Sequence, residues 1–541
     1  MNDGVGLGGA YDATLQRIKA QDGEKAKLAM ATLMWVCHSE RPLLVDELCH
    51  ALAVEIGSED FDSDNVPLIA TLLSCCQGLI TVDKEALTVR LIHHTLQEYL
   101  SAYPDLFVMA HSTIAETCLT YLNSRLVKKF PPYPLPDHQC LPFLKYSSRY
   151  WGTHTKREFS DGLMSLVLEL LSPYDTHISA MSLLQQFRSG SNFDEDLDGL
   201  DGSSLFTGLH CASFFGLVVL VTTLMDNKAC EINQRDCTGA TPLLWAAENG
   251  HEEVVMLILD QENSSPDEPD KQGRTPLWHA ASGGHDGVVR LLLEQGDVFA
   301  DSQSKGGITP LQRATVRGHK GVVRLLAEFQ DINPNLADTK GRTALWSAAA
   351  LGKDEVLKIL LERKDVDPNF PNNNGLTPLQ MAVAHGEEGT LTILLGRDDI
   401  NPNYPDDEGQ TPLMMAVALG QEGSLKMLLE RRDIDPNYRD TKGRTALWWA
   451  AVLEKDEVLK ILLERNDIDP NCPNNNGITP LQVADEEGVK LFLERKKIDA
   501  NCLENEGQVS PFSATATQHE AALKLLPERK DADPNRHDNA N

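Results

Sequence analysis

The stretch D-T-K-G-R-T-A-L-W-S-A-A-A-L-G-K-D-E-V-L-K-I-L-L-E-R-K-D-V-D-P-N, from Asp338 to Asn369, decides the fold of this chain. It returns almost unchanged from Asp440 to Asn471, an offset of 102 residues, which is three times 34. Over residues 338–380 and 440–482, 36 of 43 positions are identical. A period near 34 residues is typical of stacked repeats, so we expect a solenoid in which each unit packs on its neighbours.

The same motif recurs along residues 205–541. A degenerate unit, S-P-F-S-A-T-A, begins at Ser510, 31 residues after the last regular start. The motif resembles the ankyrin repeat, T-P-L-H-x-A-A, and the resemblance implies a mainly α fold of paired helices with short finger turns that binds proteins. Regular units begin every 34 residues, at Thr207, Thr241, Thr275, Thr309, Thr343, Thr377, Thr411, Thr445 and Thr479.

Each unit is expected to form two short helices and a turn. Thr opens the first helix as a cap, Pro suits its first turn, and a glycine such as Gly352 ends it. In the second helix, Val356, Ile359 and Leu360 fall on one face, which we expect to be buried. Segments such as D-V-D-P-N and N-N-N-G are rich in turn-forming residues and predict a projecting finger.

The units depart from the ankyrin pattern at the histidine that follows T-P-L. In the family this histidine ties turns together by hydrogen bonds, so most units here must make those ties otherwise, and the tryptophans are expected to pack between helices. The unit at Thr479 lacks about a turn of its first helix, and Pro527 interrupts the last second helix, so we expect a frayed end. The position is kept as His210 and is otherwise Leu244, Trp278, Gln312, Trp346, Gln380, Met414, Trp448 and Gln482.

Residues 1–103 predict a winged helix. The Gly-rich first ten residues are expected to be unordered, and helices are expected after Tyr11, over Leu43–Val54 and over Val66–Cys76. The runs G-L-I-T-V-D and A-L-T-V-R-L-I-H predict a hairpin, and a last helix should follow from His94. The third helix, V-P-L-I-A-T-L-L-S-C-C, has no Lys, Arg, Asn or Gln to reach a base or a phosphate, which argues against DNA binding.

Two stretches in this region carry a second resemblance: L-I-H-H-T-L-Q-E-Y-L-S-A, from Leu91, and W-V-C-H-S-E-R-P-L-L-V-D-E-L, from Trp35. They resemble the winged helix that follows the NACHT nucleotide-binding domain in NLR-like STAND proteins, especially the fungal ones with ankyrin repeats. In that family, a histidine at the place of His93 lies near the nucleotide phosphates. The sequence has no G-x-x-x-x-G-K-[ST] loop to cradle a phosphate. We therefore interpret His93 as a vestigial nucleotide-sensing residue or as a histidine satisfied at a strand–helix junction.

Residues 104–188 have further helical patterning and resemble the helical connector of the same family. Tyr146, Tyr150 and Trp151 are expected to lie in its core. Residues 189–204 are acidic and Gly-rich, which predicts a linker before the repeat array at 205–541. Their D-x-D spacing lacks the closing Glu of a calcium loop, so we expect no metal there.

Composition excludes several classes of function. The net charge of −31 over 541 residues opposes binding to nucleic acid or to an anionic membrane. Eleven scattered cysteines without C-x-x-C, and a start without a basic and apolar leader, predict an intracellular and cytoplasmic protein. There is no H-E-x-x-H, no G-x-S-x-G and no metal-ligand spacing, so we expect neither an enzyme nor a cofactor.

Ankyrin proteins usually bind partners along the concave face, with finger tips and first-helix ends, and the resemblance carries this role to matching positions. A groove with basic spots and exposed leucines would suit a protein or peptide partner with an acidic and apolar pattern; alternatively, the tips are only solvated loops. The matching finger-tip residues are Lys271, Arg274, Lys340, Arg342, Asn373, Asn374, Lys442 and Arg444, and the first-helix ends carry Leu351, Leu419 and Leu453.

Two functions remain open. The first is a non-catalytic recognition and scaffold protein, the sensor half of an NLR-like (STAND) protein whose NTPase is missing, lost or supplied by another polypeptide. The second is a substrate-adaptor subunit of an enzyme complex such as a ubiquitin ligase. The near-identity of the two blocks at exposed positions indicates tandem duplication, which would let the binding surface change quickly and suits variable targets.

Overall fold

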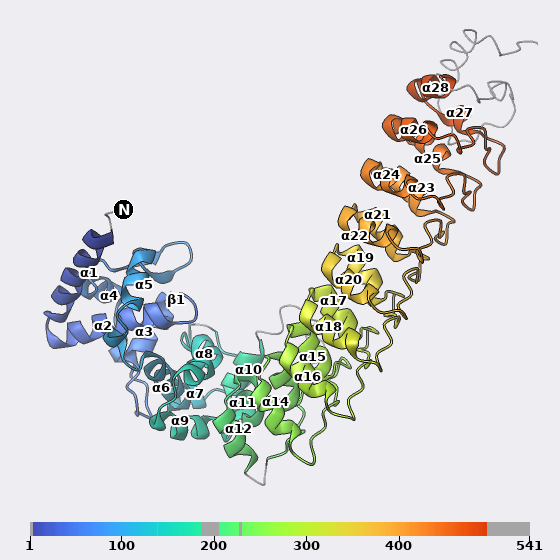
Figure 1. Ribbon diagram of the computed structural model, residues 1–541. Helices are drawn as coiled ribbons and strands as arrows, with labels where there is room; N and C mark the ends of the chain where they lie inside the picture. Colours follow the sequence, from blue (N-terminus) through green and yellow to red (C-terminus); the bar gives the residue numbers. More distant parts are fainter. Residues whose placement is uncertain (1–3, 138, 186–204, 227–229, 495–541) are drawn as a thin grey trace, which may run out of the picture. The chain divides into compact units, whose positions relative to one another are not determined.

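The computed structural model describes residues 4–137, 139–185, 205–226 and 230–494, and Figure 1 shows the order of their helices and strands. The chain divides into two units, residues 1–280 with 291–298 and residues 281–290 with 299–541. The expected linker at 189–204, the degenerate repeat from Ser510 and Pro527 lie outside the described residues. Within the described ranges, no helix has both the length and the apolar character needed to cross a membrane.

The first unit begins with the helices and small sheet expected of a winged helix. The strands are antiparallel in the order β1-β3-β2, with Leu43 opposite Val89 and Ile80 opposite Leu91. The elements are α1 (Gly4–Lys19), α2 (Gly23–His38), β1 (Leu43–Leu44), α3 (Val45–Ala53), the 3-10 turn η1 (Ser63–Asn65), α4 (Ile69–Cys75), β2 (Ile80–Asp83), β3 (Thr88–Leu91) and α5 (His94–Ser101).

Two local expectations for this region are wrong. The first ten residues are not all unordered, because α1 begins at Gly4. Leu15 and Ile18 of this helix are buried, and a helix anchored in this way extends by one hydrogen bond per added residue. The segment from Leu43 is not helical at its start, because Leu43 and Leu44 pair with β3 before α3 begins. Pairing with β3 buries Leu43 against the sheet. A helix that began at Leu43 would not make this contact.

A layer of helices follows in the first unit. Helix α6 packs against α8 and α9. Tyr146 and Trp151 are fully buried and Tyr150 is half-buried, which confirms that this aromatic group belongs to the core. The predicted boundaries of the winged helix (1–103), the helical connector (104–188), the linker (189–204) and the repeat array (205–541) stay a prediction. The elements are η2 (Pro104–Phe107), α6 (Ala110–Asn123), α7 (Arg125–Lys128), α8 (Leu144–Arg157), α9 (Asp161–Leu171), η3 (Tyr174–Thr176) and α10 (Ile178–Leu184).

The repeats supply the remaining helices as pairs. In the first unit these are α11 (Gly208–Phe215), α12 (Val218–Met225), α13 (Pro242–Glu248) and α14 (Glu252–Leu259). Helices α15 (Pro276–Gly283) and α16 (Asp286–Leu293) fall where the chain passes between units. The second unit holds α17 (Pro310–Arg317), α18 (Lys320–Glu328), α19 (Ala344–Ala350), α20 (Asp354–Leu361), α21 (Pro378–His385), α22 (Glu388–Leu395), α23 (Pro412–Leu419), α24 (Glu422–Leu429), α25 (Ala446–Val452), α26 (Asp456–Leu463), α27 (Pro480–Val483) and α28 (Glu486–Leu493).

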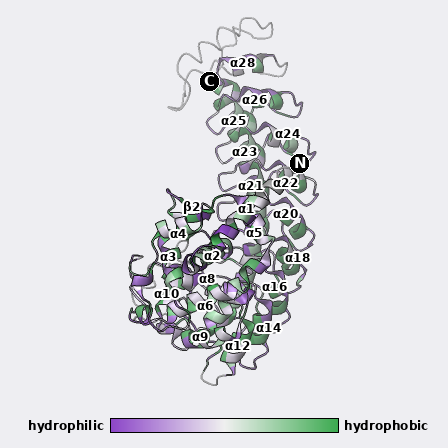
Figure 2. Ribbon diagram, turned by 90° about the vertical axis from the view of Figure 1, so that its left-hand side faces the viewer, coloured by the Kyte–Doolittle hydropathy of each residue, from purple (hydrophilic) through white to green (hydrophobic). Residues whose placement is uncertain are grey.

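The repeats fold as their residues predict. The Thr343 hydroxyl accepts the N–H of Trp346 at 3.1 Å and so caps α19. Ala348 and Ala349 are fully buried, which lets α19 approach α21 closely. Val356, Leu357, Ile359 and Leu360 are buried in the second helix, as expected. Figure 2 shows hydrophobic residues gathered in these stacked helices, whereas the loops between them are more hydrophilic.

The unit at Thr479 has a shortened first helix, as predicted. Helix α27 has 4 residues, whereas the corresponding α21 has 8. Its cap is kept, because the Thr479 N–H donates to the Gln482 side chain at 2.9 Å. The stack therefore changes at the repeat that follows the second copy of the duplicated block.

Candidate functional site

Each finger of the second unit is a turn closed by its first residue. In the finger 338–342, Asp338 Oδ1 accepts the N–H groups of Lys340 and Arg342, both at 2.9 Å. Gly341 has a φ of 77°, and a Cβ there would lie 2.5 Å from the backbone nitrogen of Asn373 in the next finger. The Asn373 N–H donates to the Lys340 carbonyl at 3.1 Å. Neighbouring fingers are thus joined edge to edge, which holds their tips in place.

The arginines predicted at the finger tips are held within their own repeats. Each is half-buried, forms an ion pair with the first Asp of its finger, and lies over the Trp of its first helix. A residue fixed in this way has less freedom to reach a partner, so its direct role in binding stays a prediction. The ion pairs are Arg274–Asp270 (2.7 Å), Arg342–Asp338 (2.6 Å) and Arg444–Asp440 (2.7 Å), and the rings are Trp278 (5.4 Å), Trp346 (5.9 Å) and Trp448 (5.5 Å).

The other predicted tip residues are exposed. Lys340, Lys442, Asn373 and Asn374 are exposed in the second unit, and Lys271 is exposed in the first. The Asn373 amide also donates to the Thr339 carbonyl at 3.0 Å, so it braces the finger before it. The finger tips between Lys340 and Lys442 carry amide and acidic side chains. The charge therefore alternates along this row of fingers.

The missing family histidine is replaced by other donors, as expected. In the first unit, His210 Nε2 lies 2.9 Å from the Gln234 carbonyl. In the second unit, Gln312 Nε2 donates to the carbonyls of Leu336 at 2.9 Å and Arg342 at 2.6 Å. Trp346 Nε1 donates to the Leu376 carbonyl at 2.9 Å. These three side chains tie their repeats to the next finger, whereas Leu244 and Met414 have no side-chain donor and Trp448 Nε1 has no hydrogen-bond partner.

Apolar side chains line the first helices of the second unit. The predicted leucines are exposed, with 47% of Leu351, 50% of Leu419 and 38% of Leu453 accessible. Because α19, α21, α23 and α25 pack in sequence, residues at equal positions form a row. We call this surface the first-helix face; it consists of Leu351, Met381, Met415, Leu419, Trp449 and Leu453, each exposed or half-buried.

Sequence reasoning missed Trp449 as a surface residue. Trp449 replaces Ser347 of the first copy, and it stays half-buried beside Trp448. The Arg444 guanidinium lies 4.1 Å from its ring centroid, and Leu453 follows one helical turn later. The signal that could have revealed it is this substitution itself, since it is one of only seven differences between otherwise identical blocks.

His93 is the N-terminal cap of α5. Its Nδ1 accepts the Thr95 N–H at 3.3 Å and lies 2.9 Å from the Thr95 hydroxyl, and its ring lies 4.1 Å from that of His94. The side chain is exposed at the junction of β3 and α5. These contacts account for the histidine locally, and a nucleotide-sensing role for His93 stays a prediction.

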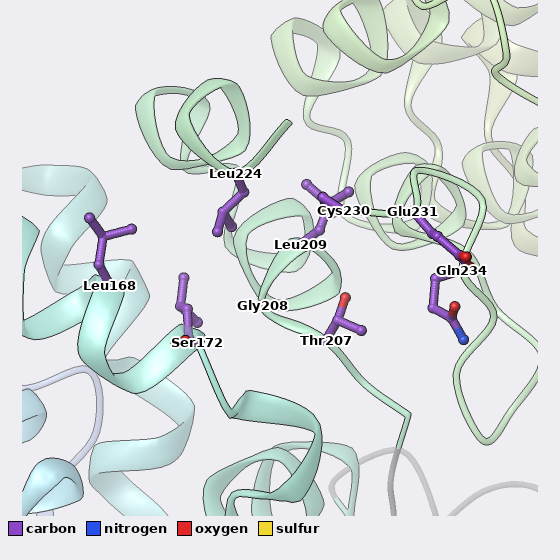
Figure 3. A pocket seen from close by; sticks show the side chains of 10 residues that line it. Leu168, Ser172, Thr207, Gly208, Leu209, Leu224, Cys230, Glu231 and Gln234 are labelled. Atoms are coloured by element: carbon purple, nitrogen blue, oxygen red, sulfur yellow. The ribbon is translucent and has the colours of Figure 1, made fainter. Parts of the chain in front are cut away.

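An open hollow of about 560 Å³ lies in the first unit between α9 and the helices α11 and α12 (Figure 3). Leu168, Leu209 and Leu224 form its apolar lining, and Glu231 and Gln234 stand at one end. It presents few convergent polar groups, unlike a site that orients a small ligand. We therefore place the candidate site on the repeats.

Comparison with known proteins identifies the repeats. Residues 209–302, 296–372, 364–440, 405–474 and 447–538 match the family model described as ankyrin repeats (3 copies), which together is more than half of the chain. The chain belongs to the ankyrin repeat family. Residues 15–106 match the model described as the winged helix domain of GPI inositol-deacylase, so the α1–α5 region is a winged helix.

Individual proteins match only part of this chain. The chain is 25% identical over 260 residues to the azaphilone pigments biosynthesis cluster protein L of Monascus ruber, which covers 42% of this chain and 54% of that protein. The chain thus spans about half the length of this curated relative. The solved ankyrin repeat domain of Bcl-3, described as a unique member of the IkappaB protein family, is 27% identical, with a TM-score of 0.39 over 41% of this chain and 100% of that chain.

Ankyrin repeats serve protein–protein interaction, and the ankyrin fold is generally a non-catalytic binding scaffold. This assigns a general role in protein–protein interaction to the repeats.

Proposed function

We propose that this protein is an intracellular, non-catalytic recognition protein, the sensor part of an NLR-like (STAND) signalling system. Its ankyrin array binds a protein or peptide partner through the first-helix face and the lysine finger tips. The observation that carries the proposal is the partial exposure of Trp449, beside the exposed Leu453 and Lys442, on fingers that are joined edge to edge. Binding energy concentrates in aromatic and apolar anchors of this kind.

The face favours an adaptable apolar contact. Met381 and Met415 occupy the position of Trp449 in the two preceding repeats, and both are half-buried. Methionine side chains are flexible and polarisable, and they suit surfaces that accept varied partners. In this row, the tryptophan would bind one end of a partner tightly. The methionines would adapt their conformation to the rest of it.

The finger tips favour acidic groups on the partner. Lys340 and Lys442 lie three repeats apart, which is about 30 Å because packed helices are 8–10 Å apart. An extended segment of about nine residues covers that distance at about 3.3 Å per residue. The acidic tips at Asp407 and Glu408 lie between the lysines, so a uniformly acidic partner is disfavoured. Acidic groups near each end and apolar residues between them fit best.

The sensor assignment is supported by the winged helix. The match over residues 15–106 agrees with the resemblance to the segment after a NACHT domain, and the array follows it in the chain. The ten cysteines in the described ranges are free thiols, which agrees with a reducing compartment.

Binding is tested by differential capture with the full chain. The wild type is compared with the double variant Trp449→Ser/Leu453→Glu and with a matched control, Lys358→Glu/Lys460→Glu, which changes exposed residues of the second helices α20 and α26. We expect a protein that the wild type and the control retain and that the Trp449/Leu453 variant loses. Equal capture by all three would contradict the assigned surface.

The sensor role is tested separately. Mapping the 5′ end of the transcript and identifying captured proteins show whether an NTPase with a Walker A loop is encoded in frame or binds as a separate chain. Either result would support the sensor role. Recovery of ubiquitin-ligase subunits without any such NTPase would favour the substrate-adaptor function instead.

A further inference from the structure

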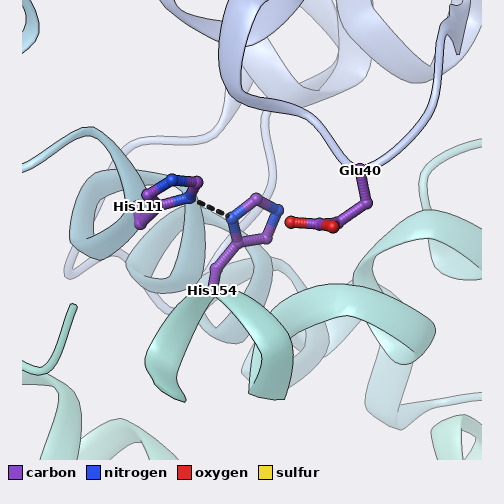
Figure 4. Close-up of side chains that lie close together, drawn as sticks. All are labelled: Glu40, His111 and His154. Atoms are coloured by element: carbon purple, nitrogen blue, oxygen red, sulfur yellow. Dashed lines mark hydrogen bonds between the residues drawn. The ribbon is translucent and has the colours of Figure 1, made fainter. Parts of the chain in front are cut away.

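Three metal-ligating side chains from distant parts of the sequence meet in the first unit (Figure 4). Glu40 lies in the turn after α2, His111 in the first turn of α6, and His154 in the last turn of α8. One ligand atom from each lies within 4.8 Å of the others. Among the described residues, no other group of His, Cys, Asp and Glu converges in this way.

The two imidazoles face each other through the same type of nitrogen. His111 Nδ1 and His154 Nδ1 are 2.8 Å apart, so without an ion they share one proton. The Tyr146 hydroxyl accepts the Glu40 N–H at 3.1 Å and lies 2.9 Å from His154 Nε2. If that hydroxyl donates to Nε2, the His154 proton sits on Nδ1 and points at the lone pair of His111.

We propose that Glu40, His111 and His154 form a binding site for a zinc ion, which takes the place of the shared proton. Two imidazole nitrogens and one carboxylate oxygen are ligands that zinc commonly uses. The His154 proton then moves to Nε2 and donates to the Tyr146 hydroxyl, whose oxygen can also accept the Glu40 N–H. The number of protons is unchanged, and the second hydrogen bond orients the ligand, as is common at metal sites.

Burial and neighbouring positive charges act on the two imidazoles. Burial, and then the positive charges of His111, Arg157 and His38, lower the pKa of His154 to about 3, and the same burial and charges oppose a cation beside the ring. Burial likewise lowers the pKa of His111. Arg157 pairs with both Glu40 oxygens, Oε1 at 2.6 Å and Oε2 at 3.0 Å, so one of these contacts must open before Glu40 can bind the ion.

The geometry requires only small movements. Tetrahedral zinc places its ligand atoms about 3.3 Å apart, given bonds of about 2.0–2.1 Å. The two nitrogens must separate by about half an ångström, and the half-buried Glu40 side chain can turn inward. A water molecule would complete the coordination. A bound ion would fasten the end of α2 to α6 and α8, and so join the winged helix to the helices that follow it.

Metal titration of the full chain tests the site. Protein stripped with a chelator is titrated with ZnCl2 by calorimetry, and Co2+ serves as a spectroscopic probe. We expect one Zn2+ per chain, a tetrahedral Co2+ absorption spectrum, and slower amide hydrogen exchange at the end of α2 and the start of α6. Glu40→Gln and His111→Ala change half-buried side chains and should each weaken binding by more than about 100-fold, while Tyr146→Phe should weaken it by about 10- to 100-fold.

Two controls make the test decisive. His385→Ala removes an exposed histidine of the second unit and should leave zinc binding unchanged. Circular dichroism checks that each variant is folded, which separates a lost site from a lost fold. Zinc binding that persists in both Glu40→Gln and His111→Ala, or no binding by the folded wild type, would show that the cluster is a hydrogen-bonded core network only.

Discussion

The two copies of the duplicated block share their finger contacts and differ most on one face. In both copies an Asp closes the finger and pairs with an Arg, through Asp338–Arg342 and Asp440–Arg444. Just before each copy, an Asn of a P-N turn donates to a carbonyl within the copy: Asn335 to Asp365 at 2.6 Å and Asn437 to Asp467 at 2.7 Å. These contacts hold neighbours together, which is where the stability of an array resides.

Three of the seven differences fall in or beside the first helix. Ser347, Ala350 and Gly352 of the first copy correspond to Trp449, Val452 and Glu454 of the second. The second copy therefore carries larger side chains on its first-helix face. Its finger contacts are kept, but the hydrogen bond from Trp346 to the Leu376 carbonyl has no counterpart at Trp448 Nε1. This teaches that the framework and the exposed face can change independently, as a recognition array requires.

Removing an arginine that caps the previous repeat should give the largest effect on stability. Arg363 donates to the carbonyls of Ala327 (2.9 Å), Phe329 (3.1 Å) and Ile332 (2.9 Å), whereas Arg465 donates to that of Leu429 (2.5 Å). We expect Arg363→Ala to cost about 3 kcal/mol and Arg465→Ala about 1.5 kcal/mol, because a hydrogen bond to a charged group contributes about 1.5–3 kcal/mol and burial is greater at Arg363.

Native-state hydrogen exchange of α18–α20 and of α24–α26 measures these two costs. Equal costs would show that the capping arginines act through their Asp partners, Asp365 and Asp467, and not through the helix carbonyls.

The next largest effect is expected on binding, when Trp449 and Ser347 are each replaced by the residue of the other copy. Trp449→Ser makes the second copy resemble the first and should reduce affinity for a captured partner by about 30-fold, equivalent to about 2 kcal/mol for a hot-spot residue. The reciprocal Ser347→Trp should leave affinity within about threefold, since the other apolar differences are absent there. Calorimetry with the purified partner measures both, and a larger loss from Ser347→Trp would place binding on the first copy.

Substitutions at the residue that ends the first helix should have a smaller effect, on the free energy of unfolding. The sign of this effect should be opposite in the two copies. Gly352 has a φ of 59° and Glu454 a φ of 53°, the left-handed region that costs a side chain about 1–2 kcal/mol. We expect Gly352→Ala to lower the free energy of unfolding by about 1 kcal/mol and Glu454→Gly to raise it by a similar amount. Urea unfolding followed by tryptophan fluorescence measures this, and a destabilising Glu454→Gly would mean that the glutamate makes a compensating contact.

In an earlier repeat, the residue that corresponds to Ser347 and Trp449 should make stability depend on pH. His279 corresponds to Ser347 and Trp449, is buried, and lies 3.2 Å from Asp270 Oδ2 and 3.7 Å from Glu248 Oε1. Burial lowers its pKa, but hydrogen bonds to the two carboxylates outweigh burial and raise the pKa above its ordinary value.

The stabilisation from His279 is therefore fully present below about pH 6.5, the unfolded pKa, and is lost as the pH rises through the folded pKa. We expect His279→Gln to lower the melting temperature more at pH 6 than at pH 9. The same loss at both pH values would show that the histidine contributes packing and not charge.

The period explains how much of the fold was predictable. Thr caps, Ala pairs and the missing residues at Thr479 act within one repeat, so they fix α19, α21 and the short α27 directly. The pairing of β1 with β3 and the start of α1 depend on contacts that local patterns do not contain. The helix propensity of Leu43–Val54 is overridden at its first two residues by the sheet.

The site was less predictable because its residues act through partners. Lys340, Lys442 and the leucines are exposed, as their positions indicate. Arg342 and Arg444 each form an ion pair with an Asp four residues earlier. This spacing is visible in the sequence, but in a turn it does not determine whether the two side chains meet. The cluster of Glu40, His111 and His154 could not be foreseen, since only packing of α6 against α8 brings the histidines together.

Hydrogen–deuterium exchange of the full chain, with and without its purified partner, tests the central claim most directly. The account predicts protection of the finger and first helix at residues 440–453, weaker protection at residues 338–351, and unchanged exchange in the second helices α20 and α26. Protection confined to the second helices or to the winged helix would contradict it.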